Sequence, residues 1–176
     1  GSAIPRLFVS FFIILLFTPF RLIEAFLYLF AKREQVKQPI FIVGHFRSGT
    51  TYVHDALNEL DTVVAPRMVD CLYPYLNKYF KFMLVPILKK ALPETRLMDE
   101  MKVTWDSPQE EEFALSLMTL DTSVSFLYAP KSNSKQLNSS VLLIDERAKS
   151  KWLKAHLKFA RKLQSMNKGK TLVFKS

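Results

Sequence analysis

The chain has little cysteine and little histidine. Among its 176 residues it has one cysteine, Cys71, and three histidines. A single cysteine excludes a disulfide within the chain, so we predict that Cys71 is a buried structural thiol. A structural zinc site needs about four nitrogen or sulfur ligands at close spacing, which one cysteine and three scattered histidines do not supply. The sequence therefore predicts no metal site.

Acidic residues are also few relative to basic ones. The chain has 16 Asp and Glu against 25 Lys and Arg, a formal net charge of +9. Such a charge attracts anions, including nucleotides, lipid headgroups and nucleic acids. No nucleic-acid-binding motif is present and the basic residues are spread among apolar ones, so we predict no nucleic-acid partner. With 49% hydrophobic residues, the chain can form one globular core and is not disordered.

One long hydrophobic run occupies residues 7–20, which are apolar except for Ser10, Thr18 and Pro19. As a helix this run would be about 21 Å long, whereas the hydrocarbon core of a bilayer is roughly 30 Å thick. Thr18 followed by Pro19 is typical of a helix N-cap and first helical position. We therefore predict two short apolar helices that join at Thr18 and Pro19.

The second of these helices is predicted to end at Arg33, with Arg21 and Glu24 paired on one of its faces. Short apolar helices that end in basic residues favour an interfacial or re-entrant membrane anchor, which we assign to residues 1–36. A single tilted span through Phe30 is an alternative, as are helices that dock on the protein's own sheet. A signal peptide is disfavoured because no small-residue cleavage site follows. The chain is thus predicted to be membrane-associated.

A strand, a glycine turn and a helix are predicted next. Residues 40–43 are apolar, rich in β-branched and aromatic side chains and followed by Gly44, which is typical of a strand buried on both faces of a parallel sheet. The sequence GHFRSGTT over residues 44–51 then has the spacing of a phosphate-binding loop. The helix that begins at Thr50 is predicted to pack on the strand through apolar residues three or four apart. These are Val53, Ala56, Leu57 and Leu60.

The loop suits an oxyanion but not a nucleoside triphosphate. A triphosphatase requires Lys where this chain has Thr50. Gly49 lets the main chain approach an anion, and the free N–H groups of Thr50 and Thr51 lie at the positive end of the helix dipole. Arg47 adds a planar guanidinium that suits bidentate contact with an oxyanion. A donor other than a triphosphate is therefore favoured.

Three further stretches lie between this loop and the last helix. Residues 73–84 are so rich in aromatic and apolar side chains that we interpret them as core packing, with a lid over an acceptor pocket as the alternative. Ser107, Pro108 and Glu110 match a capping box with proline at the first helical position, which predicts a helix that begins at Ser107. Residues 121–140 are rich in Ser, Asn and Thr and are predicted to form a loop.

Residues 144–166 have the pattern of an amphipathic helix. Its buried face is predicted to contain Trp152, Leu153, His156, Leu157, Phe159, Ala160 and Leu163. Its solvated face is predicted to contain Lys149, Lys151, Lys154, Lys158, Arg161 and Lys162. We interpret His156 as a packed histidine rather than a ligand. Residues 171–174 predict a second buried strand with Lys175 at its carboxyl end, where open α/β sheets collect ligands.

Two motifs resemble a known family. RSGTT at residues 47–51 resembles the 5′-phosphosulfate loop of sulfotransferases that use 3′-phosphoadenylyl sulfate (PAPS), in particular the bacterial-type branch, which has Arg where the cytosolic enzymes have Lys. Residues 95–99 (TRLMD) and 106–115 (DSPQEEEFAL) are similar to TRPMD-like and DSPQE-EFAL segments of the same branch, although Leu97 replaces the proline. The resemblance implies an α/β fold, a P-loop-like three-layer sandwich with a central parallel sheet, of which residues 37–176 form the N-terminal portion.

The resemblance also implies roles for particular residues. Arg47 would contact the bridging and sulfuryl oxygens of PAPS. The 5′-phosphate would be bound by Arg47, Ser48, Gly49, Thr50 and Thr51. Lys175 matches the Lys of the family's strand-end LKSP-type motif and would stabilise the sulfuryl group from the opposite side. A general base must accept the acceptor's proton, and we predict Glu111, with Glu110, Glu112 and His45 as alternatives.

The sequence therefore predicts a PAPS-dependent sulfotransferase that transfers a sulfuryl group to a hydroxyl of a lipophilic or carbohydrate acceptor. The family's segments that hold the 3′-phosphate and the adenine are not in these residues. The alternative is accordingly a catalytically incomplete, membrane-anchored binding or assembly module of the same fold. A P-loop kinase is disfavoured by Thr50 in the Lys position.

Overall fold

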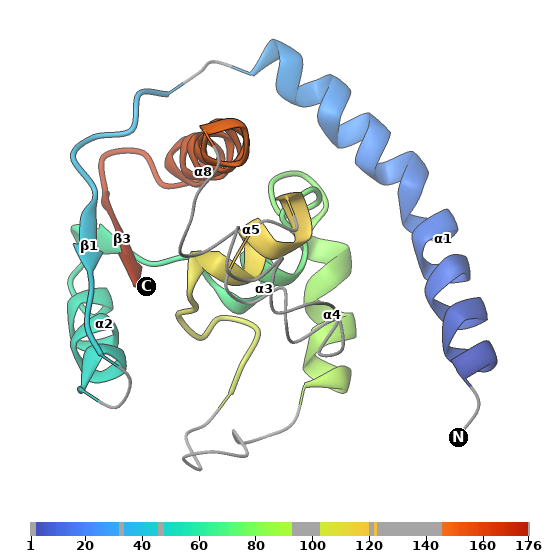
Figure 1. Cartoon of the computed structure of the whole chain (residues 1–176), viewed down its shortest axis with the longest axis horizontal. Helices are drawn as coiled ribbons and strands as arrows, with labels where there is room; N and C mark the ends of the chain where they lie inside the picture. The colour runs from blue at the N-terminus through green and yellow to red at the C-terminus, as the bar shows by residue number, and fades with distance from the viewer. Residues whose placement is uncertain are drawn as a thin grey trace.

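The computed structural model describes residues 3–31, 34–45, 48–92, 103–119, 122 and 146–175 (Figure 1). The predictions for Arg47, for residues 95–99 and for residues 121–140, except Thr122, lie outside the described residues. In chain order the elements are α1 (Ala3–Phe30), β1 (Ile40–Ile42), α2 (Thr50–Asn58), β2 (Val63–Val64), α3 (Met68–Leu72), α4 (Lys81–Ala91), α5 (Glu111–Thr119), α8 (Glu146–Met166) and β3 (Thr171–Lys175).

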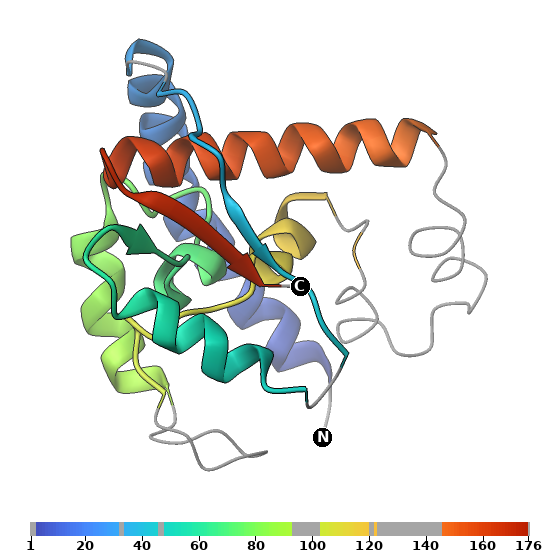
Figure 2. The ribbon, with the colours of Figure 1, turned by 90° about the vertical axis from the view of Figure 1, so that its left-hand side faces the viewer.

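The described strands form a parallel sheet in the order β1-β3-β2, which confirms the predicted parallel sheet. β3 comes last in the chain but lies in the middle, where Val173 pairs with Ile40 of β1 and Thr171 pairs with Val63 of β2. Figure 2 shows β1 and β3 side by side, with their carboxyl ends at the same edge. β2 was not predicted, because two residues are too few for a recognisable strand pattern.

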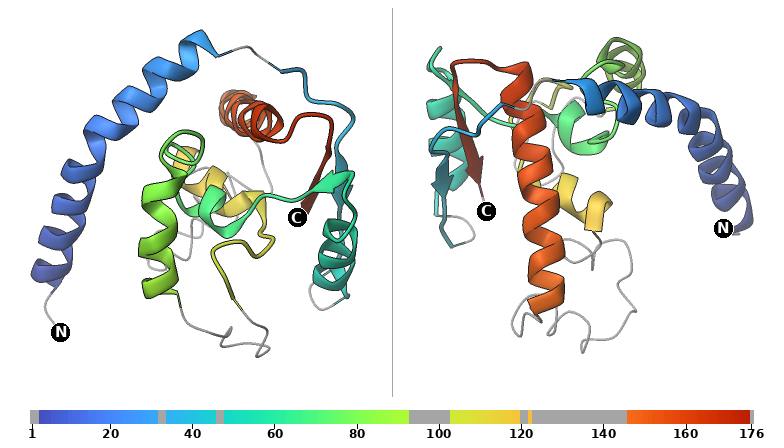
Figure 3. Two further views of the ribbon diagram at one scale, coloured as in Figure 1. Left: turned by 180° about the vertical axis from the view of Figure 1, so that it is seen from behind. Right: turned by 90° about the horizontal axis from the view of Figure 1, so that it is seen from above.

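Alternating side chains of β3 divide the core into two layers. Leu172 and Phe174 pack with residues of α8, α5 and α3, whereas Val173 points to the opposite face and packs with Val63 and Ala65. Leu57 of α2 packs against this second cluster. Figure 3 shows the sheet between α2 and α8. The helices cover both faces, so the predicted α/β fold is confirmed.

The prediction that β1 is buried on both faces is wrong. Ile40 is 39% exposed and Phe41 51% exposed. β1 lies at the edge of the described sheet and pairs on one side with β3, so its apolar residues are only partly covered.

The predicted apolar face of α2 is also wrong in part. Val53, Ala56 and Leu60 are exposed, and Leu57 is half-buried. The residue of α2 that is fully buried is His54, at 2% exposure. The helix therefore packs on the sheet through a face that is partly polar.

α1 is one helix, not two. Thr18 does not act as an N-cap; its hydroxyl donates to the Ile14 carbonyl one turn earlier at 2.6 Å, and Pro19 lies inside the helix. Residues Phe11–Phe30, with a mean hydropathy of 1.9, are long and apolar enough to cross a membrane. This length matches the single-helix alternative, while composition alone is equally compatible with a signal sequence or a core helix.

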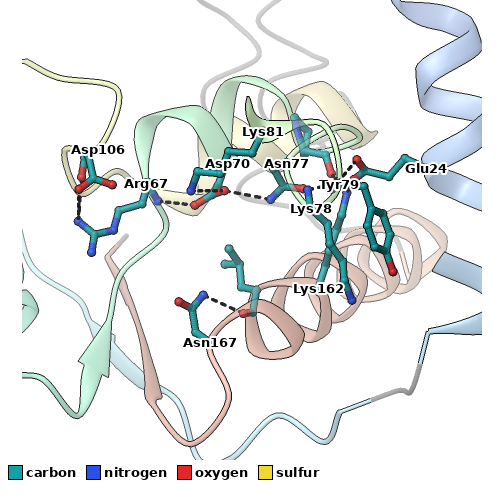
Figure 4. Close-up of polar contacts among 12 residues, drawn as sticks. Glu24, Arg67, Asp70, Asn77, Lys78, Tyr79, Lys81, Asp106, Lys162 and Asn167 are labelled. Carbon is teal, nitrogen blue, oxygen red and sulfur yellow. Dashed lines mark hydrogen bonds and ion pairs between the residues drawn. The ribbon is translucent and has the colours of Figure 1, made fainter. Parts of the chain in front are cut away.

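Glu24 pairs with the domain rather than with Arg21, contrary to the prediction. Its carboxylate accepts hydrogen bonds from the main-chain N–H groups of Lys78 at 3.2 Å and Tyr79 at 3.1 Å, and it forms an ion pair with Lys162 (Figure 4). Arg21 instead lies over the ring of Tyr75, 4.5 Å from its centroid. One polar stripe of α1 therefore holds the helix against the domain.

The aromatic residues that follow α3 serve mostly in packing. Tyr73 and Phe80 lie against a buried cluster that includes Leu84, and Phe17 and Phe20 of α1 pack on the same cluster. The interpretation of this stretch as core packing is confirmed for these residues.

α5 begins at Glu111 rather than at Ser107. The Ser107 hydroxyl accepts a hydrogen bond from the main-chain N–H of Thr104 at 2.9 Å, and Pro108 forms an antiparallel bridge with Arg67. The capping-box pattern therefore stabilises a turn before the helix, and the predicted helix start is wrong.

α8 agrees with the predicted helix within its described range, but three side chains are on the opposite face from the one expected. Leu153 and Leu157 are each 45% exposed, whereas Lys162 is buried. His156 is buried as predicted, with its ring 5.0 Å from those of Trp152 and Phe174.

Candidate functional site

The phosphate-binding loop and the end of β3 meet at one point. The Lys175 ammonium donates a hydrogen bond to the Thr51 hydroxyl at 2.9 Å, although the two residues are 124 positions apart. They meet because β1 and β3 are parallel neighbours in which Ile42 pairs with Lys175, so the loop after β1 begins where β3 ends. The structure thus brings together two of the residues that the sequence singled out.

Glycine is required at two positions of this loop. A Cβ on Gly44 would lie 2.6 Å from Thr50 Cγ2 and 2.9 Å from Ser48 Oγ, closer than real side chains approach. Gly49 has a φ of 86°, in the left-handed region that disfavours other residues. The Ser48 N–H donates to the His45 carbonyl at 3.2 Å, which closes the turn.

The N-terminus of α2 faces this turn without a side-chain cap. Gly49 occupies the N-cap position, and because it has no side chain it cannot accept a capping hydrogen bond from the first N–H groups of α2. The first N–H groups of a helix have no partner within the helix, and they lie at the positive end of its dipole. Among the described residues, the loop therefore has the features of an anion site, as predicted from its spacing.

Two glutamates hold Lys175 from the other side. The Lys175 ammonium lies 2.8 Å from a carboxylate oxygen of Glu110, whose side chain is 34% exposed. The Lys175 main-chain N–H donates to the buried carboxyl of Glu111 at 3.2 Å. Glu110 therefore contacts the charged end of Lys175, while Glu111 contacts its main chain.

Burial changes the acidity of Glu111. It raises the pKa of this carboxyl from 4.5 to about 8, with the charges of Glu112 and Glu110 acting in the same direction. Hydrogen bonds from its own main-chain N–H and from that of Lys175 oppose this shift. The pKa of Glu112 is raised as well, by burial and then by the charge of Glu110. The choice of Glu111 as general base remains a prediction.

We expect Glu111 to make stability depend on pH. Its pKa is about 8 in the folded state against an ordinary value of 4.5, so between these values the folded state binds more protons than the unfolded state. Stability from this group is therefore full below about pH 4.5 and is lost as the pH rises to about 8. Relative to Glu111→Gln, the free energy of unfolding of the wild type should fall by up to about 1.4 kcal/mol per pH unit in this window.

Urea unfolding at several pH values between these limits measures this difference. Glu146→Gln is the control, because the Glu146 side chain is 85% exposed and should give a curve parallel to that of the wild type. If the Glu111→Gln curve is also parallel to that of the wild type, the assigned pKa is wrong.

His54 is a site residue that the sequence reasoning missed. Its pKa is lowered by burial first and by the charge of Lys175 second, and it is also hydrogen-bonded to the main chain of Val173. Its Nε2 atom has no hydrogen-bond partner among the described residues. His54 follows Thr51 by three residues, so helical spacing could have placed both on one face.

Cys71 is a buried thiol close to the glutamates at Lys175. Cys71 is fully buried, as predicted, and its thiol donates to the Glu110 carbonyl at 3.4 Å. Burial, followed by the charge of Asp70, raises the pKa of the thiol well above its usual value, which disfavours a reactive thiolate.

Within the described ranges, no cluster of three or more His, Cys, Asp and Glu residues has the geometry to hold a metal ion.

Comparison with known proteins finds relatives for part of the chain. The chain is similar to mycobacterial sulfotransferases. It is 36% identical over 85 residues to the omega-hydroxy-beta-dihydromenaquinone-9 sulfotransferase Stf3 of Mycobacterium bovis (strain ATCC BAA-935 / AF2122/97) and of Mycobacterium tuberculosis (strain CDC 1551 / Oshkosh). The aligned stretch is 47% of this chain but only 21% of each relative. No family model and no solved structure matches. The partial homology supports sulfuryl transfer in general.

Proposed function

We propose that this chain is part of a membrane-associated sulfotransferase that moves a sulfuryl group from PAPS to a hydroxyl of a lipophilic or carbohydrate acceptor. The observation that carries the proposal is the contact between Lys175 and Thr51. It puts a nearly buried ammonium beside the uncapped start of α2, so a phosphosulfate would find cations and N–H donors on two sides. The partial homology to sulfotransferases supports the same reaction.

The reaction needs charge neutralisation more than covalent help. The bond between sulfur and the bridging oxygen of PAPS breaks as a bond between sulfur and the acceptor oxygen forms, and adenosine 3′,5′-bisphosphate leaves. The N–H groups of the loop would hold the 5′-phosphate, and Lys175 would neutralise charge on the transferring oxygens. Arg47, which lies outside the described residues, is proposed to contact the same oxygens from the loop.

The acceptor proton goes to a carboxylate in this proposal. Of the two glutamates at Lys175, Glu110 is partly exposed and contacts the ammonium, whereas Glu111 is buried and accepts a main-chain N–H. We therefore favour Glu110 as the base and a positioning role for Glu111. Glu110→Gln should then lower the rate about 100-fold or more with acceptor saturating. A larger loss in Glu111→Gln would return the role to Glu111.

The exposed face of α1 supports membrane association. Large apolar side chains lie on this helix away from the domain, including Phe11, Phe12, Leu22, Phe26 and Phe30, each at least 60% exposed. A contiguous apolar surface of this kind marks contact with a membrane or a partner. Because Glu24 holds the opposite face of α1 on the domain, we propose that α1 lies in the membrane interface.

Calorimetry with PAPS tests the nucleotide part of the proposal. The chain should release heat on binding PAPS or adenosine 3′,5′-bisphosphate and should bind ATP with magnesium more weakly, since the loop lacks the triphosphatase lysine. No binding of PAPS even at millimolar concentration would count against the enzyme and leave the binding-module alternative.

Gly44→Ala should weaken PAPS binding about tenfold or more. The added methyl group would collide with Thr50 Cγ2 and Ser48 Oγ and displace the loop. Gly169→Ala is the matched control: Gly169 has a φ of 82° and open space around it, so alanine costs about 1 kcal/mol of stability outside the loop. Calorimetry should show normal PAPS binding by Gly169→Ala, and equal losses in both variants would mean that the effect is one of stability.

A further inference from the structure

A cavity of about 360 Å³ lies between α1 and α8, outside the proposed nucleotide site. Arg21, Tyr28 and Leu29 of α1 form one wall, and Lys158 and Phe159 of α8 form the other. No described residue of the loop at 44–51 lines it, and neither does Lys175. Its volume is in the range of small-molecule binding sites, which span about 300 to 1,000 Å³.

The cavity is strongly basic. Its lining includes five cationic side chains, namely Arg21, Lys154, Lys158, Arg161 and Lys162. The carboxylate among its described lining residues is that of Glu24, which already binds Lys162 and the N–H groups of Lys78 and Tyr79. In the part of the chain that the structure describes, the other four cations have no carboxylate partner. A bound anion would supply the missing negative charge.

Two of these cations converge on one ring. Arg21 lies 4.5 Å and Lys158 lies 6.0 Å from the centre of the Tyr75 ring. They come from different helices, far apart in the sequence, and both are exposed. Two positive charges held around one ring repel each other, and a phosphate that contacts both would offset this repulsion. The charge of Lys158 also contributes to lowering the pKa of the buried Lys162, after the larger effect of burial.

Apolar surface adjoins the basic lining. Ala25, Leu29 and Phe159 line the cavity, and Leu29 is itself 73% exposed on the outer surface of α1. Phe26 and Phe30 extend this exposed apolar surface along the helix. A ligand with an anionic head and apolar chains would cover both the basic cavity and the apolar face of α1 beside it. A free anion would leave the apolar face uncovered.

We infer that this cavity binds the phosphate headgroup of an anionic membrane lipid, whose acyl chains lie along the exposed face of α1. Phosphate meets Arg21 and Lys158 beside Tyr75, and Lys154 and Arg161 add positive charge at the rim. This inference depends on the membrane association of α1 but not on sulfuryl transfer, because it involves neither the loop nor Lys175.

Vesicle sedimentation with the whole chain tests it. The chain should bind vesicles of phosphatidylcholine with phosphatidylglycerol more tightly than vesicles of phosphatidylcholine alone. Arg21→Gln/Lys158→Gln should weaken binding to the anionic vesicles about 25-fold and leave binding to neutral vesicles unchanged. Arg21→Lys/Lys158→Arg, which keeps both charges, should retain most of the affinity.

Lys37→Gln/Lys90→Gln is the matched control, since it removes the same charge from exposed lysines that do not line the cavity. It should cost less than about threefold. An equal loss in both double variants would mean general attraction of a basic protein, and would overturn the site. Unchanged melting temperatures of the variants, expected because all four side chains are exposed, would exclude unfolding as the cause.

Two further outcomes separate the possible sources of phosphate. Inorganic phosphate should displace the chain from anionic vesicles less well than soluble short-chain phosphatidylglycerol at the same concentration, because it lacks the acyl chains that would contact α1. Equal displacement by the two, lost in the Arg21→Gln/Lys158→Gln variant, would assign the cavity to a free anion and overturn the lipid. Failure to bind any vesicle would overturn the membrane role of α1 and the lipid site together, while PAPS calorimetry would still report on the nucleotide site.

Discussion

Replacing Lys175 with methionine should lower the rate of sulfuryl transfer by roughly three orders of magnitude. The Lys175 side chain is only 10% exposed, and its ammonium lies between the Thr51 hydroxyl and Glu110. Methionine keeps much of the stem but removes the charge that would neutralise the transferring oxygens. Because the Lys175 side chain is nearly buried, the effective dielectric constant around its charge is low, and the loss of this charge is costly.

The measurement is transfer of a labelled sulfuryl group from PAPS to a panel of alcohols, sterols and glycolipids, with Lys170→Met as the control. Lys170 directly precedes β3 and does not contact the loop in any described interaction, so its variant should keep the wild-type rate. The loss in Lys175→Met should appear in kcat rather than in the KM of the acceptor. A variant that transfers within threefold of the wild type would exclude a role for this ammonium in the reaction.

Replacing Glu24 with leucine should destabilise the fold by about 3 to 5 kcal/mol. The substitution leaves the buried Lys162 ammonium without its carboxylate and leaves the N–H groups of Lys78 and Tyr79 without their acceptor. Among the described residues, Lys162 would retain only the Pro74 carbonyl, at 2.9 Å, as a hydrogen-bond partner. Burial already lowers the pKa of Lys162, and Glu24 is the main influence that keeps its charged form stable.

Urea unfolding in a mild detergent measures this loss, and a double-mutant cycle isolates the pair. Glu24→Leu/Lys162→Met should recover much of the stability, since removing both charges avoids an unpaired one. Glu146→Leu, which removes an exposed partner of Lys149 on α8, should change stability by less than about 0.5 kcal/mol. Additive losses for Glu24 and Lys162 would show that the two side chains do not act as a pair.

The parts of the fold that were predicted correctly depend on local sequence. β3 can be recognised from its own apolar residues, without knowledge of the strands beside it. Lys175 is its last residue, so its position at the carboxyl end of the sheet could be predicted as well. The turn at Gly49 and the start of α2 at Thr50 follow from glycine spacing. The strand before the loop, β1, and the last strand, β3, were both predicted. Because they lie parallel, the proximity of Thr51 and Lys175 could be anticipated from the topology of the sheet.

The errors arise where contacts distant in sequence decide the outcome. The Gln109 N–H donates to the Pro66 carbonyl at 2.8 Å, and the Met68 N–H donates to the Ser107 carbonyl at 2.9 Å. These bonds hold the segment before α5 against the start of α3, so the helix begins later than its capping pattern suggests. The prediction that Lys162 lies on the solvated face of α8 rested on helical periodicity alone. Periodicity does not show that α1 covers this part of α8, where Lys162 is buried.

If α1 lies in a membrane interface, as proposed, the link between Glu24 and Lys162 fixes the orientation of the domain on the bilayer. If α1 turned about its own axis, the carboxylate would leave its ammonium and face the hydrocarbon chains, which disfavour a charge by several kcal/mol. The helix would thus have one preferred rotation, and the domain attached to it would present the same side to the lipid at all times. An acceptor drawn from the bilayer, as proposed, would then approach Lys175 from a constant direction.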